Sequence, residues 1–200
     1  MMTIERQKKI AKSIIISGAI VCVVATGVLF AHTETVPSAE RESMQESPQI
    51  VLSTSESAKA YMRRMEGYTP YAVWDYAQYT YGYGSRADYE GQYISESDAK
   101  ALFDNSLTLY ENAVREFEAQ NNLHFNQNQF DALVSFSYNL GAGVFKKYAD
   151  SDLVRLIVSG DYTDAEITDA FCQFCKAGGK VLPGLVARRE WEAKRFLGTN

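Results

Sequence analysis

The feature that most constrains this chain is an uncharged, mostly apolar run of nineteen residues at positions 13–31, SIIISGAIVCVVATGVLFA. A helix of about 20 apolar residues is long enough to span a bilayer. Residues 1–12 carry four basic side chains against one acidic one, and basic flanks tend to stay on the cytoplasmic side. We therefore predict a cytoplasmic flank over 1–12, a single membrane anchor over 13–31, and export of everything that follows.

A cleaved signal peptide is the alternative for the same segment, and the mature protein would then be secreted. The run exceeds the roughly 7–15 residues of a typical signal core, and Leu29-Phe30-Ala31 lacks the small residues of a typical cleavage site. Both observations favour the anchor. Residues 32–52 are rich in Ser, Glu, Thr, Pro and Gln, which predicts a solvated linker. The folded domain is expected over 53–200.

Within that domain, most segments show the helical spacing of apolar residues. The stretch Met65–Ser85 differs, because it alternates large and small residues and ends in two glycines, Gly82 and Gly84. That pattern predicts a short β-hairpin. The expected fold is α+β, a mostly helical domain with one small hairpin. The predicted helices run from about 53 to Glu66, over 95–120, 126–140, 151–158 and 163–175, and from 183 onward.

Composition excludes several classes of function. The net charge is −5, whereas a general nucleic-acid binder should be basic. Of the two histidines, His124 lies in a polar connector without an acidic neighbour. Cys172 and Cys175 form a lone C-x-x-C without the second pair that a zinc site needs. We expect no nucleic acid, metal or cofactor, a monomer, and two buried free thiols on one face of a helix.

Two carboxylates, Glu66 and Asp75, lie near Thr80 in a segment crowded with tyrosines and Trp74. Cutting a sugar–sugar bond requires one protonated carboxyl for the leaving group and one ionised carboxylate for the attacking water. Each residue also has a plainer interpretation. Glu66 could pair with a neighbouring arginine at a helix end, Asp75 could initiate a turn, and Thr80 could simply favour a strand.

Three stretches resemble the phage-type lysozymes of glycoside hydrolase family 24. The first runs from Glu66-Gly67 through Asp75 and Thr80 to Gly84. The second is FDALVSFSYNLG, residues 130–141, which resembles the central buried helix of that family. The third, AGGKVLPGL at 177–185 followed by RRE at 188–190, resembles its C-terminal signature. The likeness covers about residues 55 to 198.

The resemblance implies a muramidase that hydrolyses the β-1,4 bond between N-acetylmuramic acid and N-acetylglucosamine in peptidoglycan, and so breaks down bacterial cell walls. It implies that Glu66 is the general acid, that Asp75 holds the attacking water or stabilises charge, and that Thr80 helps to place that water. Inverting enzymes of this kind need carboxyl groups about 6.5–9.5 Å apart. Expected substrate-binding residues are Tyr83, Asn139 and Arg188.

The chain departs from the family pattern at two points: residues 76–79 form a turn about one residue short, and Ser85 stands where the family often has His. A one-residue change can turn a strand side chain to the other face, so Tyr79 or Tyr81 could replace Thr80. Two other functions stay open, a catalytically silent peptidoglycan-binding module and a different glycosidase such as a chitinase. Some exported phage lysozymes have an anchor that later leaves the membrane, and Cys22 lies in this one.

Overall fold

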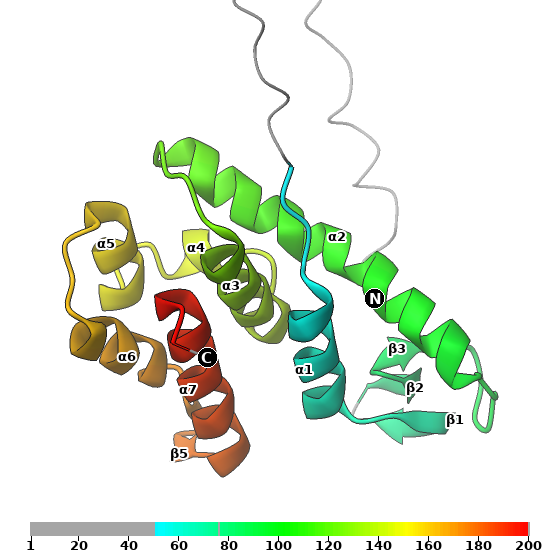
Figure 1. Ribbon diagram of the computed structural model, residues 1–200. Coiled ribbons are helices and arrows are strands. Elements are labelled where there is room, and N and C mark those ends of the chain that lie inside the picture. Colours follow the sequence, from blue (N-terminus) through cyan, green and yellow to red (C-terminus); the bar gives the residue numbers. More distant parts are fainter. Residues whose placement is uncertain (1–50, 76, 200) are drawn as a thin grey trace, which may run out of the picture. The chain divides into compact units, whose positions relative to one another are not determined.

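The computed structural model of the protein describes residues 51–75 and 77–199 (Figure 1). The expected cytoplasmic flank, the apolar segment with Cys22 and nearly all of the linker lie outside the described residues. No helix in the part that is described is long and apolar enough to cross a membrane.

The domain begins with helix α1 (Glu56–Glu66), whose first turn is capped by the Ser55 side chain. Gly67 ends the helix with a φ of 74°, a conformation that glycine adopts without strain. A three-stranded antiparallel sheet follows in the order β1 (Thr69–Asp75), β2 (Gln78–Gly82) and β3 (Ser85–Arg86). The predicted hairpin is therefore confirmed, with a short third strand added.

All the predicted helices are present, and the α+β class is confirmed. Ser95, Asn126, Ser151 and Thr163 cap four of them through side-chain oxygens that accept backbone N–H groups, as expected from local sequence. One additional helix is four residues long, too short for a periodic apolar pattern to reveal. The helices are α2 (Glu96–Gln120), α3 (Gln127–Leu140), α4 (Val144–Lys147), α5 (Asp152–Ser159), α6 (Asp164–Cys172) and α7 (Pro183–Leu197).

Helix α3 is the centre of the core. It packs between α2 and α7 (Figure 1), and every residue from Phe130 to Ser137 is buried. Phe136 makes edge contacts with Phe171 and Phe174, which bring α6 onto the same helix. Because α3 is covered on several sides, its polar residues must find partners inside the protein.

The prediction of one helix over 163–175 is wrong at its C-terminal end. Helix α6 ends at Cys172, and the chain turns into a small hairpin of β4 (Lys176–Ala177) and β5 (Lys180–Val181). Gly178 and Gly179 both have positive φ, 57° and 76°, as two-residue hairpin turns require. Cys172 and Cys175 therefore do not share a helix face; both are free and half-buried.

Candidate active site

Glu66 lies at the C-terminal end of α1, where its side chain keeps 27% of its surface exposed. Its Oε1 accepts a hydrogen bond from Nη1 of Arg188 on α7 at 2.8 Å. The partner is thus a distant residue, not Arg63 or Arg64 of the same helix. Arg63 pairs instead with Asp104.

Arg188 is almost fully buried, with 4% of its surface exposed. Each of its three guanidinium nitrogens has a partner: Nη1 binds Glu66, Nε faces Glu192 Oε1 at 3.4 Å, and Nη2 donates to the carbonyl oxygen of Ser135 at 3.3 Å. The guanidinium carbon lies 5.8 Å from the centre of the Tyr138 ring. Because each nitrogen of this planar guanidinium is bound to a partner, Arg188 holds the Glu66 carboxylate in a defined place.

Glu192 and Arg189 are both completely buried beside Arg188. Glu192 Oε1 accepts from the Ser135 hydroxyl at 2.7 Å and from Arg189 Nη2 at 3.0 Å, and its Oε2 lies 2.8 Å from Arg189 Nε. Burial raises the pKa of Glu192, and the two arginines act in the opposite direction. The hydrogen bonds and ion pairs compensate a carboxylate that would otherwise be costly to bury.

Tyr138 of α3 lies under the Arg188 guanidinium and is influenced by the charge of Glu66. Burial raises the pKa of its phenol, and the negative charge of Glu66 acts in the same direction. Its hydroxyl donates to the carbonyl oxygen of Tyr83 at 3.5 Å. Among these groups, the Arg188 guanidinium is the one hydrogen-bonded to Glu66, and the Tyr138 ring lies beside that guanidinium.

Asp75 and Thr80 lie on the sheet. Asp75 is exposed at the end of β1, and Thr80 is half-buried in β2. Val73 pairs with Thr80, and Asp75 pairs with Gln78. Since residues directly opposite in an antiparallel pair share a face, and so do residues two apart on one strand, Asp75 and Thr80 lie on the same face of the hairpin.

The other face of the hairpin carries Trp74 and Tyr79, whose rings meet edge to face with centres 5.1 Å apart. Asp75 pairs directly with Gln78. This register keeps Asp75 and Thr80 on one face and turns Tyr79 and Tyr81, the proposed replacements for Thr80, to the other.

The three expected substrate-binding residues have different settings. Arg188 is buried in the ion network. Tyr83 is buried, and its hydroxyl donates to Glu96 Oε1 at 3.1 Å. Tyr83 also lines a hollow of about 410 Å³ together with Gly67 and Tyr68, next to the end of α1. Asn139 is half-exposed and accepts from Arg189 Nη2 at 3.0 Å.

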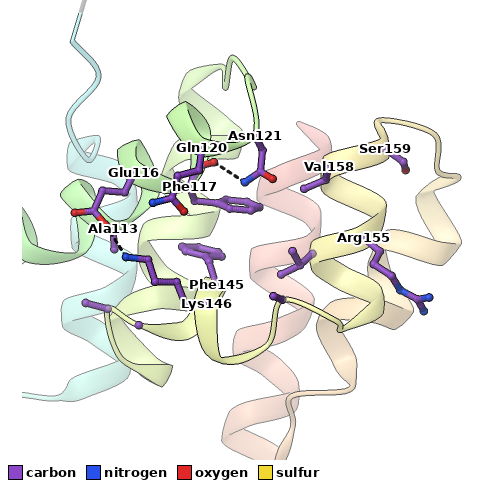
Figure 2. A pocket seen from close by; sticks show the side chains of 14 residues that line it. Ala113, Glu116, Phe117, Gln120, Asn121, Phe145, Lys146, Arg155, Val158 and Ser159 are labelled. Atoms are coloured by element: carbon purple, nitrogen blue, oxygen red, sulfur yellow. Dashed lines mark hydrogen bonds and ion pairs between the residues drawn. The ribbon is translucent and has the colours of Figure 1, made fainter.

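A larger pocket of about 620 Å³ lies elsewhere, between α2, α4 and α5 (Figure 2). Phe117 and Phe145 stack within it at 4.5 Å, and Lys146 pairs with Glu116 at 3.2 Å. None of the six predicted site residues lines it. Across residues 51–75 and 77–199, no cluster of three or more His, Cys, Asp or Glu side chains could hold a metal ion.

Sequence reasoning missed Glu192, Ser135 and Tyr138. One signal for Glu192 was available, because it follows Arg188 by four residues and Arg189 by three, the spacings at which helix side chains meet. Nothing local identifies Ser135, which lies 57 positions from Glu192. Arg188 and Arg189 are both buried, because α7 packs their face onto α3.

Comparison with known proteins agrees with this geometry. The chain is 37% identical to an endolysin of Bacillus phage B103 over 60% of this chain and 43% of that protein. It is 33% identical to a SAR-endolysin of Bacteriophage PS119 over 56% of this chain and 62% of that protein. The chain thus spans about half the length of these relatives.

A solved structure and a family model extend the likeness. The muramidase domain of SpmX from Asticaccaulis excentricus superposes with a TM-score of 0.61 at 29% identity, over 72% of this chain and 97% of that one. The family model for phage lysozyme matches residues 63–192, a span that contains Glu66, the hairpin, α3 and the buried charges of α7. The chain therefore belongs to the phage lysozyme family.

Proposed function

We propose that this protein is a muramidase that hydrolyses the β-1,4 bond between N-acetylmuramic acid and N-acetylglucosamine in peptidoglycan. The observation that carries the proposal is the placement of Glu66 at the end of α1, where 27% of its side-chain surface is exposed and Arg188 binds it at 2.8 Å. The adjoining hairpin presents Asp75 and Thr80 on one face. Membership of the phage lysozyme family and the names of the relatives support the same reaction.

In the proposed mechanism, the protonated Glu66 carboxyl donates its proton to the oxygen of the leaving sugar. Asp75, exposed at the end of β1, orients a water molecule and withdraws its proton as the water attacks the anomeric carbon. The Thr80 hydroxyl forms a hydrogen bond with that water, as donor or as acceptor. An inverting outcome requires room for this water between the carboxyl groups, about 6.5–9.5 Å.

Substrate binding is a further part of the proposal. Asn139 is half-exposed and can reach a glycan directly, whereas Tyr83 borders the hollow that Gly67 and Tyr68 also line. Arg188 has little surface left for a sugar, so we assign its main effect to the placement of Glu66. Tyr71, Tyr89 and Tyr93 add exposed aromatic rings around the sheet, a surface on which sugar rings can stack.

We further propose the organisation expected from sequence: a cytoplasmic flank at 1–12, an anchor at 13–31, a linker at 32–52 and the catalytic domain at 53–200, outside the cytoplasm. The uncharged run and its basic flank support it, as does the name SAR-endolysin of one relative. Fractionation of expressing cells over time tests it. The full chain should first sediment with membranes, and recovery only from the cytoplasm would overturn the proposal.

The test of function is Glu66→Gln in the full chain, measured as release of reducing sugar from purified cell wall. We expect a loss of about 10²–10⁴-fold, the usual contribution of a general acid. Glu90→Gln is the matched control, since it neutralises an exposed carboxylate next to the same sheet. Activity near that of the unchanged protein in Glu66→Gln would reject the assignment.

The same assay separates the alternatives. Wall binding by the unchanged protein without any release of reducing sugar would favour a silent peptidoglycan-binding module, which the exposed aromatic rings would also suit. A preference for chitin oligomers would instead indicate a different glycosidase.

A further inference from the structure

The general acid of the proposed reaction is held by an arginine that is itself held by a second, wholly buried carboxylate. We propose that Glu192 is a positioning residue for Glu66, acting through Arg188, and that it sets the pH range over which Glu66 can serve as an acid. The inference rests on the proposed function, because it concerns the same reaction.

The first step is the geometry of Arg188. Its three guanidinium nitrogens go to three different acceptors: Glu66 Oε1, Glu192 Oε1 and the Ser135 carbonyl oxygen, at 2.8, 3.4 and 3.3 Å. With all three guanidinium nitrogens bound, the Arg188 side chain is restricted to one rotamer. The position of Glu66 Oε1 is therefore defined by a group buried behind it.

The second step is the support of Glu192 itself. It has no exposed surface and lies on α7, one turn after Arg188. The Ser135 hydroxyl donates to its Oε1 at 2.7 Å, and Arg189 contacts both of its oxygens. Arg189 is held in turn by Asn139. These contacts fix Glu192 from α3 as well as from its own helix.

The third step is charge. Around Glu66, the groups that the structure places against it are Arg188 from α7 and Tyr138 from α3; Arg63 is engaged by Asp104, and Arg64 lies over Tyr61. A lone buried guanidinium at 2.8 Å would strongly favour the ionised carboxylate, which cannot donate a proton. Glu192 lies on the other side of this guanidinium and offsets part of its positive charge.

The consequence has a defined sign. Removing the negative charge of Glu192 leaves Arg188 attracting Glu66 more strongly, and the ionised form of Glu66 is then favoured at lower pH. The alkaline limb of the pH–rate profile should move toward acid. A residue that only held the fold together would lower the amount of active protein without moving that limb.

The experiment is Glu192→Gln in the full chain, assayed on purified cell wall from acid to alkaline pH. We expect the alkaline limb of the pH–rate profile to move about one pH unit toward acid. At a fixed pH on that limb, kcat should then fall about tenfold, because one pH unit is a tenfold change in the protonated fraction. KM should be nearly unchanged, because Glu192 does not reach the substrate. Glu192→Asp, which keeps the charge, should restore the position of the limb.

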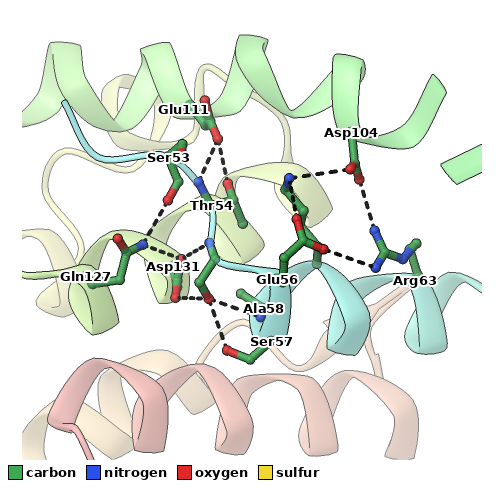
Figure 3. A network of polar contacts seen from close by, with 12 residues as sticks. Ser53, Thr54, Glu56, Ser57, Ala58, Arg63, Asp104, Glu111, Gln127 and Asp131 are labelled. Atoms are coloured by element: carbon green, nitrogen blue, oxygen red, sulfur yellow. Dashed lines mark hydrogen bonds and ion pairs between the residues drawn. The ribbon is translucent and has the colours of Figure 1, made fainter. Parts of the chain in front are cut away.

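Asp131→Asn is the matched control. Asp131 of α3 is also a fully buried carboxylate, and it bonds to Arg195 of α7 at 2.6 Å. Figure 3 shows its further contacts with Gln127 and with the start of α1. It contacts neither Arg188 nor Glu66. Both variants should be destabilised, but only Glu192→Gln should move the pH profile.

If Glu192→Gln does not fold, Ser135→Ala takes its place, because it removes the hydroxyl that donates to Glu192 Oε1 and so disfavours the ionised form of Glu192. It should move the limb in the same direction by a smaller amount. A folded variant of either kind whose profile superposes on that of the unchanged protein would overturn the inference. That result differs from failure of the proposed function, in which Glu66→Gln would itself stay active.

Discussion

The two halves of the candidate site are built in opposite ways. Glu66 is bonded to Arg188, and behind it lie three more buried groups, Glu192, Arg189 and Ser135. Asp75 and Thr80 lie on a small sheet, and among the described residues their side chains have no hydrogen-bond partner. One half is fixed by side chains from distant parts of the chain, whereas the other is placed only by the backbone register of a hairpin.

This difference fits the two tasks. The acid must meet one oxygen of the substrate, and a carboxyl set by a rigid ion network meets it in the same place each time. The other half must admit a water molecule and a glycan strand, so its polar groups have to stay open to solvent. The hairpin is attached instead at its open end, where Thr69 pairs with Gly82. There Tyr68 donates to the Ile94 carbonyl oxygen at 2.8 Å, and Gly82 lies against Ala99 of α2.

Asp75→Asn should have the largest effect, and it tests the difference between the Glu66 half and the Asp75–Thr80 half of the site. Because Asp75 has no partner in the described residues, the change should leave stability nearly unaltered, yet activity should fall about 10²–10⁴-fold if Asp75 is the base. Release of reducing sugar and a thermal melt measure the two effects. Asp88→Asn, another exposed aspartate beyond the sheet, is the control, and an active Asp75→Asn would remove the residue from the mechanism.

Gly82→Ala tests how the hairpin is attached. Gly82 has a φ of 60°, and an added Cβ would lie 2.9 Å from the Ala99 Cβ. Backbone strain and overpacking together should cost about 2–4 kcal/mol of unfolding free energy. Gly84→Ala separates the two causes, since its φ is also positive but its Cβ would meet nothing within 4 Å; equal losses in urea unfolding would contradict the contact with α2.

Thr80→Val tests whether the Thr80 hydroxyl acts on the attacking water. Valine keeps the branched shape but removes the hydroxyl, so the strand should persist while one hydrogen bond to the attacking water is lost. About a fivefold fall in kcat is expected, since one such bond is worth about 1 kcal/mol. Thr80→Ser should recover most of the activity, and equal rates for valine and serine would show that Thr80 acts only through its strand preference.

Trp74→Ala should have the smallest effect on catalysis. Trp74 lies on the face of the hairpin opposite Asp75 and contacts Tyr79. The change should reduce stability by about 0.5–1.5 kcal/mol through loss of the ring pair and leave kcat close to that of the unchanged protein. Trp74→Phe keeps a ring and is the control; a large fall in kcat with alanine would mean that this face, too, meets the substrate.

Much of the fold follows from short stretches of sequence. The caps at Ser55, Ser95 and Asn126 place three helix starts because a side-chain oxygen one turn away satisfies free backbone N–H groups. The apolar residues of 126–140 cover more than one face, which correctly marks α3 as buried. The end of α6 could not be predicted in this way, because Phe174 stays in the core through contacts with Phe136 and Tyr148 after the helix has stopped.

By itself, the sequence determined where helices begin, where the hairpin lies, and which carboxylates could do acid–base chemistry, since caps, periodicity and turns act over a few residues. Only the tertiary structure decided what surrounds those carboxylates. Glu66 and Arg188 are 122 positions apart, and Ser135 and Glu192 meet only because α7 packs on α3. A buried charge needs a partner at a few ångströms, and which partner arrives there is set by the packing of whole helices.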